Sequence, residues 1–169
     1  MTREGKPIPR AVVLGAVATA VMIGALAWAG YAVWFQANGQ LSAANAQDST
    51  QVEAGRAIYA ANCASCHGDK LQGQPNWKER KPDGKLPAPP HDATGHTWHH
   101  PDEQLFRIVK LGVAAIVPGY QTDMTGFADR LSDQDIWNVI AFIKSTWPAE
   151  IQARQAEMSR AAAKQESPN

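Results

Sequence analysis

The sequence is poor in cysteine and has no excess charge of either sign. Its 169 residues include 2 Cys, and its 16 basic side chains are balanced by 16 acidic ones. Two cysteines form at most one disulfide, so a disulfide-stapled secreted scaffold is excluded. A chain that binds nucleic acid by neutralising phosphates carries an excess of basic side chains. The formal net charge of this chain is +0. We therefore expect no nucleic acid among its partners.

The patterns typical of several enzyme classes are missing as well. The sequence contains no strand-like alternation of apolar and polar residues, no internal repeat, no glycine-rich phosphate loop and no serine–histidine–acid order. With no strand pattern, we expect an all-α chain.

One long apolar run lies near the N-terminus. Residues 11–35 carry no charged side chain. As a helix this run is about 37 Å long, against about 30 Å of bilayer hydrocarbon. Aromatic side chains crowd its C-terminal end, as at a membrane interface: Trp28, Tyr31, Trp34 and Phe35. Basic side chains precede it: Arg3, Lys6 and Arg10. The positive-inside rule places residues 1–10 in the cytoplasm and the C-terminal part outside.

A cleaved signal peptide is the competing interpretation of this run. Ala44, Asn45 and Ala46 offer a small-x-small cleavage site. However, the apolar run is far longer than the usual core of a signal peptide, and the site lies well beyond its end. We interpret residues 11–35 as a retained transmembrane anchor and residues 36–50, rich in Gln, Ala and Asn, as a flexible linker. Both interpretations export the rest of the chain.

Residues 51–148 are expected to form one compact helical domain. Apolar spacing and helix-end signals predict helices over residues 52–62, 102–111 and 132–147, with loops between them. Residues 149–169 are rich in Ala and charged side chains and poor in large apolar ones. We expect them to form a solvated C-terminal tail.

The first of these loops is unusually long. Residues 68–100 show almost no apolar periodicity, and Pro and Gly recur among them. A structureless stretch of this length is normally evidence against a compact domain. Such a loop is compatible with a compact domain if a bound group fills the core in place of side chains. The length of this loop therefore points to a large cofactor.

A short motif at the end of the first helix carries the chemistry. Two thiols, those of Cys63 and Cys66, can each bond one vinyl group of a haem, and His67 beside them can bind the iron. A thioredoxin-type dithiol needs a βαβ context that is absent, and a local disulfide would leave the histidine incidental. A zinc site would need two further ligands, at spacings that fit no zinc module. We therefore predict one covalently bound haem c.

The sixth ligand of the iron must come from another part of the chain. Met124 lies in the loop between the second and third helices, and a thioether there would raise the reduction potential. The remaining methionines lie in the N-terminus, the anchor and the tail: Met1, Met22 and Met158. The competing ligands are four histidines of one short stretch: His91, His96, His99 and His100. If these histidines do not bind the haem iron, the stretch could hold a second metal such as copper or form a polar loop. We favour the polar loop.

The compact domain resembles a class I cytochrome c over about residues 52–148. Gly55 and Tyr59 precede the haem motif, as the family's glycine and aromatic residue do. Val139 and Phe142 match the apolar and aromatic positions of the family's last helix. The resemblance implies that the first and last helices cross where the glycine lies.

The resemblance also concerns both axial positions of the haem. It implies an axial methionine upstream of the last helix, where Met124 stands, although the residue that follows is Thr125 rather than the frequent Pro. The family usually has a proline whose carbonyl orients the proximal histidine, which here is His67. Pro89 and Pro90 are the two candidates for that proline.

We expect an all-α, cytochrome c-like domain around a covalent haem, with one N-terminal transmembrane helix. Its function would be single-electron transfer between respiratory or other periplasmic redox partners, as a carrier and not as an enzyme. The chain would be a single-pass protein of a bacterial inner membrane with the haem domain in the periplasm. The alternatives are a haem sensor or a subunit of an oxidase or dehydrogenase with a labile sixth ligand, and a zinc- or copper-binding module without haem.

A basic cluster lies in the long loop, with acidic residues interspersed. Its members are Lys70, Lys78, Arg80, Lys81 and Lys85. Such a cluster either steers an acidic redox partner or is a solvated loop of mixed charge, which is the commoner case.

Overall fold

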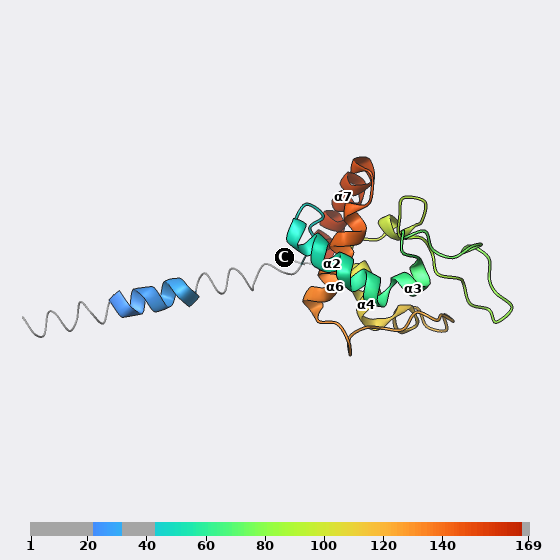
Figure 1. The fold of residues 1–169 in the computed structure, drawn as a ribbon, viewed down its shortest axis with the longest axis horizontal. Coiled ribbons are helices and arrows are strands. Elements are labelled where there is room, and N and C mark those ends of the chain that lie inside the picture. The colour runs from blue at the N-terminus through green and yellow to red at the C-terminus, as the bar shows by residue number, and fades with distance from the viewer. Residues whose placement is uncertain (1–21, 32–42, 167–169) are drawn as a thin grey trace, which may run out of the picture. The chain divides into compact units, whose positions relative to one another are not determined.

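The computed structural model describes residues 22–31 and 43–166, which fall into two units (Figure 1). In the first unit, Met1–Gln40, the described residues form a helix. Most of the predicted anchor, residues 11–35, and much of the predicted linker, residues 36–50, lie outside the described residues. Among the residues that are described, no helix is both long enough and apolar enough to cross a membrane.

The second unit, Leu41–Asn169, consists of helices joined by loops. Figure 1 labels five of them, in chain order α2 (Ser49–Asn62), α3 (Ala64–His67), α4 (Asp102–Leu111), α6 (Asp133–Ser145) and α7 (Ala149–Glu166). A 3₁₀ turn (Thr97–His99) precedes α4, and the short helix α5 (Val113–Ile116) follows it. Over residues 43–166 the chain forms no strand, and an isolated bridge joins Gly112 to Thr125. The expectation of an all-α domain is confirmed, and the three predicted helices correspond to α2, α4 and α6.

Side-chain caps define where the two central helices begin. The carboxylate of Asp48 accepts hydrogen bonds from the N–H groups of Thr50 and Gln51, at 2.9 and 3.2 Å. At the start of α6, the hydroxyl of Ser132 accepts from the N–H of Asp135, whose carboxylate accepts from the N–H of Ser132. These caps satisfy N–H groups that have no partner within a helix. The starting points of α2 and α6 are therefore set by local sequence.

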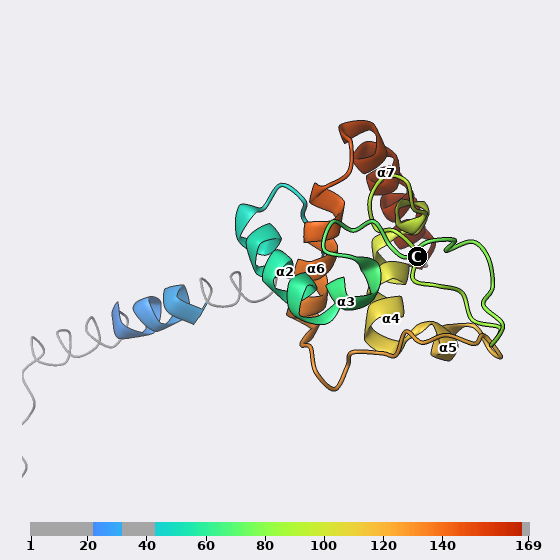
Figure 2. The ribbon, with the colours of Figure 1, turned by 45° about the vertical axis from the view of Figure 1, so that its right-hand side comes forward.

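The crossing of α2 and α6 forms the centre of the core. Figure 2 shows α2 lying across α6. A Cβ atom at Gly55 would lie 1.9 Å from the carbonyl oxygen of Asn138, so the two backbones touch at a position that admits no side chain. The rings of Tyr59 and Phe142 pack 5.4 Å apart beside this contact. The helix crossing implied by the resemblance is thus present.

The C-terminal segment, expected to be a solvated tail, is the helix α7 over most of its length, and one of its faces contacts the rest of the unit. Gln155 is fully buried, and its amide donates to the Asp102 carboxylate at 2.7 Å and to the His100 carbonyl at 3.1 Å. Lys144 of α6 donates to the same carboxylate at 2.7 Å. α7 therefore has a docked face as well as a solvated one, and Asp102 joins α4, α6 and α7.

Candidate functional site: a haem-attachment motif

The two cysteines lie where α2 passes into α3. Cys63 ends α2, with its N–H donating to the Tyr59 carbonyl at 2.8 Å, and Cys66 lies on the single turn of α3. Both thiols are free; Cys63 is half-buried and Cys66 is exposed. Burial, with a smaller contribution from Cys66, raises the pKa of Cys63 to about 11. A redox-active dithiol requires a lowered thiol pKa, so this environment does not favour thiol–disulfide exchange.

His67, the last residue of α3, is buried and held at one ring nitrogen. Its Nδ1 lies 2.8 Å from the carbonyl oxygen of Pro89. A carbonyl only accepts, so Nδ1 carries the proton and Nε2 keeps its lone pair. Burial lowers the pKa of His67 and the hydrogen bond opposes this shift. The imidazole is therefore neutral near pH 7, with one nitrogen free for a metal, and the structure selects Pro89 over Pro90.

Backbone bonds lead the long loop back to this histidine. The Tyr59 hydroxyl donates to the Gly68 carbonyl at 3.0 Å, and the N–H of Gly73 donates to the His67 carbonyl at 2.7 Å. Gly68 has a φ of 81°, a conformation that suits glycine and turns the chain out of α3. Further on, the N–H of His91 donates to the Leu71 carbonyl at 2.8 Å. These contacts place the second half of the loop beside the first.

The histidines of residues 91–100 do not converge on one point. His91 stacks on His67, with ring centroids 3.9 Å apart and an interplanar angle of 23°. His96 stacks on Trp77 at 5.4 Å, and His99 stacks on Trp98 at 3.7 Å. In the described part of the chain, no group of three or more His, Cys, Asp and Glu residues could hold a metal ion. Ligands on opposite faces of one iron point their nitrogens at each other, so the stacked pair does not have the geometry of two such ligands.

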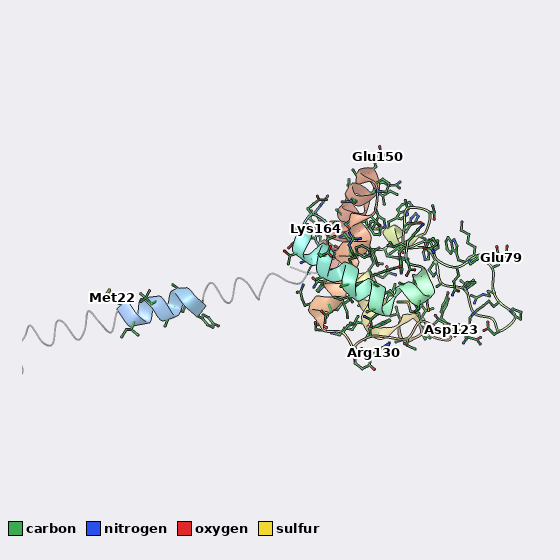
Figure 3. The ribbon with its side chains drawn as sticks, in the orientation of Figure 1. Met22, Glu79, Asp123, Arg130, Glu150 and Lys164 are labelled. Carbon is green, nitrogen blue, oxygen red and sulfur yellow. The ribbon has the colours of Figure 1, made fainter. Side chains whose placement is uncertain are left out.

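Met124 lies on a separate loop, between α5 and α6. Its side chain is half-buried, and its N–H donates to the Thr122 hydroxyl at 3.0 Å. The preceding residue, Asp123, forms ion pairs with Lys81, at 3.0 Å, and with Lys85. Figure 3 labels Asp123 on the same side of the unit as Glu79, a residue of the long loop. The methionine loop is thus joined to the basic loop, a connection that the sequence pattern did not indicate.

The donor set of these segments fits a covalently attached haem. Two free thiols and a neutral imidazole with an available nitrogen lie on neighbouring turns, and a thioether comes from a separate loop. These are the groups that attach and ligate the iron of c-type haem. The Pro89 carbonyl contributes the outer bond that fixes a metal-binding imidazole in one tautomer.

Comparison with known proteins decides the family. The model of the family described as "Cytochrome c" matches residues 52–147. This chain belongs to the cytochrome c family. Membership implies a covalently bound haem c and electron transfer through it, and the Cys63, Cys66 and His67 spacing agrees with this.

Curated proteins and solved structures add little to this family assignment. No curated protein matches the chain. Among solved structures, the cytochrome c domain is similar to cytochrome CL from the marine methylotrophic bacterium Methylophaga aminisulfidivorans, with 19% sequence identity and a TM-score of 0.45. That match covers 76% of this chain and 77% of the other.

Proposed function

We propose that this chain is a membrane-tethered monohaem c-type cytochrome that carries single electrons between redox proteins outside the cytoplasm. The observation that carries the proposal is the bond from His67 Nδ1 to the Pro89 carbonyl, directly beside the free thiols of Cys63 and Cys66. It gives the histidine the tautomer that an iron ligand needs, next to the two groups that attach a haem.

Each residue of the site then has one role. Cys63 and Cys66 would hold the haem through thioether bonds, His67 would bind the iron through Nε2, and Met124 would supply a thioether on the opposite face. The bound haem supplies a one-electron iron couple, whose potential a thioether ligand raises. With His67 and Met124 both bound to the iron, no iron position would be left for a substrate, so the chain would act as a carrier and not as an enzyme.

The apolar run supports the membrane tether. Residues 11–35 carry no charge and follow basic residues, which favours an N-terminus in the cytoplasm and a haem domain in the periplasm of a bacterium. Ala44, part of the candidate cleavage site, is 7% exposed, and its carbonyl accepts from Lys144 at 3.2 Å. Cleavage after Ala46 would remove that contact, which favours a retained anchor. A tether raises the effective concentration of the carrier near membrane-bound partners.

The partners that we propose are other redox proteins. Lys81 and Lys85 are paired with Asp123, so the basic loop offers Lys70, Lys78 and Arg80 as its exposed cations. This charge favours a donor or acceptor with an acidic surface.

The ferric absorption spectrum of the purified, haem-loaded protein tests the site. We expect the weak far-red charge-transfer band of a sulfur–iron bond, and its loss in Met124→Ala with the haem retained. Met158→Ala, on α7, is the control and should keep the band. A band that survives in Met124→Ala would remove that residue as ligand, and a wild-type spectrum without the band would favour the sensor with a labile sixth position.

Topology is tested separately with a reporter fused after Asn169. We expect the reporter to be active only when it lies outside the cytoplasm. Activity inside would contradict the proposed orientation.

A further inference from the structure

The imidazole of His91 covers one face of the His67 ring. Their centroids are 3.9 Å apart, and their planes differ by 23°. No other residue of the His91–His100 stretch has a described ring contact with His67. This contact lies beside the proposed iron ligand and has no role in the function proposed above.

His91 is itself held firmly on several sides. Its N–H donates to the Leu71 carbonyl at 2.8 Å, and its carbonyl accepts from the indole N–H of Trp147 at 2.8 Å. Its Nδ1 lies 2.8 Å from the Thr97 hydroxyl, which donates to the Pro90 carbonyl at 3.4 Å. The Thr97 hydroxyl has one proton, which it donates to Pro90, so in its bond with His91 the hydroxyl accepts and Nδ1 donates. Backbone and ring are therefore both fixed.

The bond to Pro89 leaves one freedom of the His67 ring open. A single hydrogen bond at Nδ1 sets the tautomer, but the plane of the ring can still tilt by rotation about the χ1 and χ2 bonds of the side chain. A flat group anchored by other elements and stacked on one face prevents this rotation. His91 meets both conditions, since it is anchored by Leu71, Thr97 and Trp147.

We propose that His91 is a positioning residue that sets the plane of the His67 imidazole, and through it the orientation of the axial ligand on the haem iron. This inference rests on the proposed function, in which His67 binds the iron. In ferric low-spin haem the plane of the axial imidazole controls how unpaired spin is distributed around the macrocycle. The paramagnetic shifts of the haem methyl protons report that distribution directly.

Proton NMR of the ferric, haem-loaded full chain tests the proposal. His91→Leu removes the flat ring and should change the order or the spread of the haem methyl shifts. His91→Phe keeps a stacked ring without the bond to Thr97, and its methyl shifts should stay close to those of the wild type. His99→Ala is the matched control, because His99 belongs to the same loop but stacks on Trp98.

The outcomes separate clearly. A wild-type shift pattern in His91→Leu, or equal changes in the Leu and Phe variants, would overturn the proposal. If His91→Leu does not take up haem, His91→Asn decides in its place, because its amide can still donate to Thr97 but it has no ring to stack on His67. A changed pattern supports the role of His91, and an unchanged one contradicts it. A wild-type protein without any low-spin methyl resonances would refute the proposed function, and this inference with it.

Discussion

Asp123, the residue directly before Met124, forms ion pairs with two lysines of a loop about forty positions away, with its carboxylate 3.0 Å from Lys81. The second lysine is Lys85. The residue after the methionine is Thr125, where the family often has a rigid proline. An external ionic contact therefore restrains a loop that lacks this internal restraint.

Removing the charge of Asp123 should make the proposed Met124 ligand easier to displace. We expect Asp123→Asn to lower the Kd for added imidazole at the iron by about two- to fivefold, as suits an exposed ion-pair network. Spectroscopic titration of the ferric protein with imidazole measures this. The effect should shrink at 1 M salt, because screening weakens exposed pairs.

Asp129→Asn is the control for this titration. Asp129 lies on the same loop and pairs only with its neighbour Arg130, at 3.7 Å, among the ion pairs of the described residues. Equal Kd values for wild type, Asp123→Asn and Asp129→Asn would show that the ion pairs do not restrain the loop.

The helix crossing should not tolerate a methyl group. Gly55→Ala would place a Cβ atom 1.9 Å from the backbone oxygen of Asn138, so α2 and α6 must separate. We expect a loss of about 2–3 kcal/mol in the free energy of unfolding, measured by chemical denaturation. Gly30→Ala has nothing within 4 Å of the added atom and should leave stability unchanged. Equal stability of the two variants would contradict the crossing.

Two aspartates allow a matched test of buried and exposed ion pairs. Asp102 and Asp133 are each the first residue of a helix, and each pairs with a lysine at 2.7 Å. The side chains of Asp102 and Lys144 are 19% and 8% exposed, whereas that of Asp133 is 62% exposed. Asp102→Ala leaves a lysine buried without its partner and should cost about 3 kcal/mol. Asp133→Ala should cost less than about 1 kcal/mol.

This comparison also tests the docking of α7. Asp102→Ala removes an acceptor of Gln155 and should increase hydrogen exchange of the α7 amides, whereas Asp133→Ala should not. Unfolding free energies that fall equally in both variants, with no change in exchange, would contradict the network.

Tyr59 should give the domain a pH-dependent stability. Burial raises the pKa of Tyr59, and its hydroxyl donates to the Gly68 carbonyl at 3.0 Å. A raised folded-state pKa contributes stability that is complete below the ordinary tyrosine value of about 10 and is lost as pH rises through the folded value. Tyr59→Phe should therefore lower the unfolding free energy by about 1 kcal/mol at pH 7 and show a weaker decline above pH 10.

Denaturant unfolding at neutral and alkaline pH checks this prediction. Tyr120→Phe, on the loop before Met124, is the control and should behave as the wild type at both values. A Tyr59→Phe variant whose stability declines with pH as steeply as the wild type would contradict the assigned role.

Much of this architecture is predictable because its signals are local. α4 runs from Asp102 to Leu111 as predicted, since Pro101 precedes it and Gly112, with a φ of 82°, ends it. The haem motif depends on three residues within five positions, and the helix crossing depends on one glycine in a family pattern.

Other features depend on contacts between distant segments, which the sequence pattern does not contain. Pro89 and Pro90 are adjacent and chemically alike, and only the path of the loop brings one carbonyl to His67. Gln155 bonds to a residue 53 positions away, so the docked face of α7 has no apolar pattern to reveal it. The stacking of His91 on His67 likewise requires two loops to meet.

The most direct test of the account is the mass of the full-length chain, expressed with haem-attachment machinery and then fully denatured. We predict a mass equal to that of the polypeptide plus one haem. In the Cys63→Ser, Cys66→Ser double variant, we predict the mass of the polypeptide without haem. A wild-type chain with the mass of the bare polypeptide would contradict covalent haem attachment, and with it the proposed electron carrier.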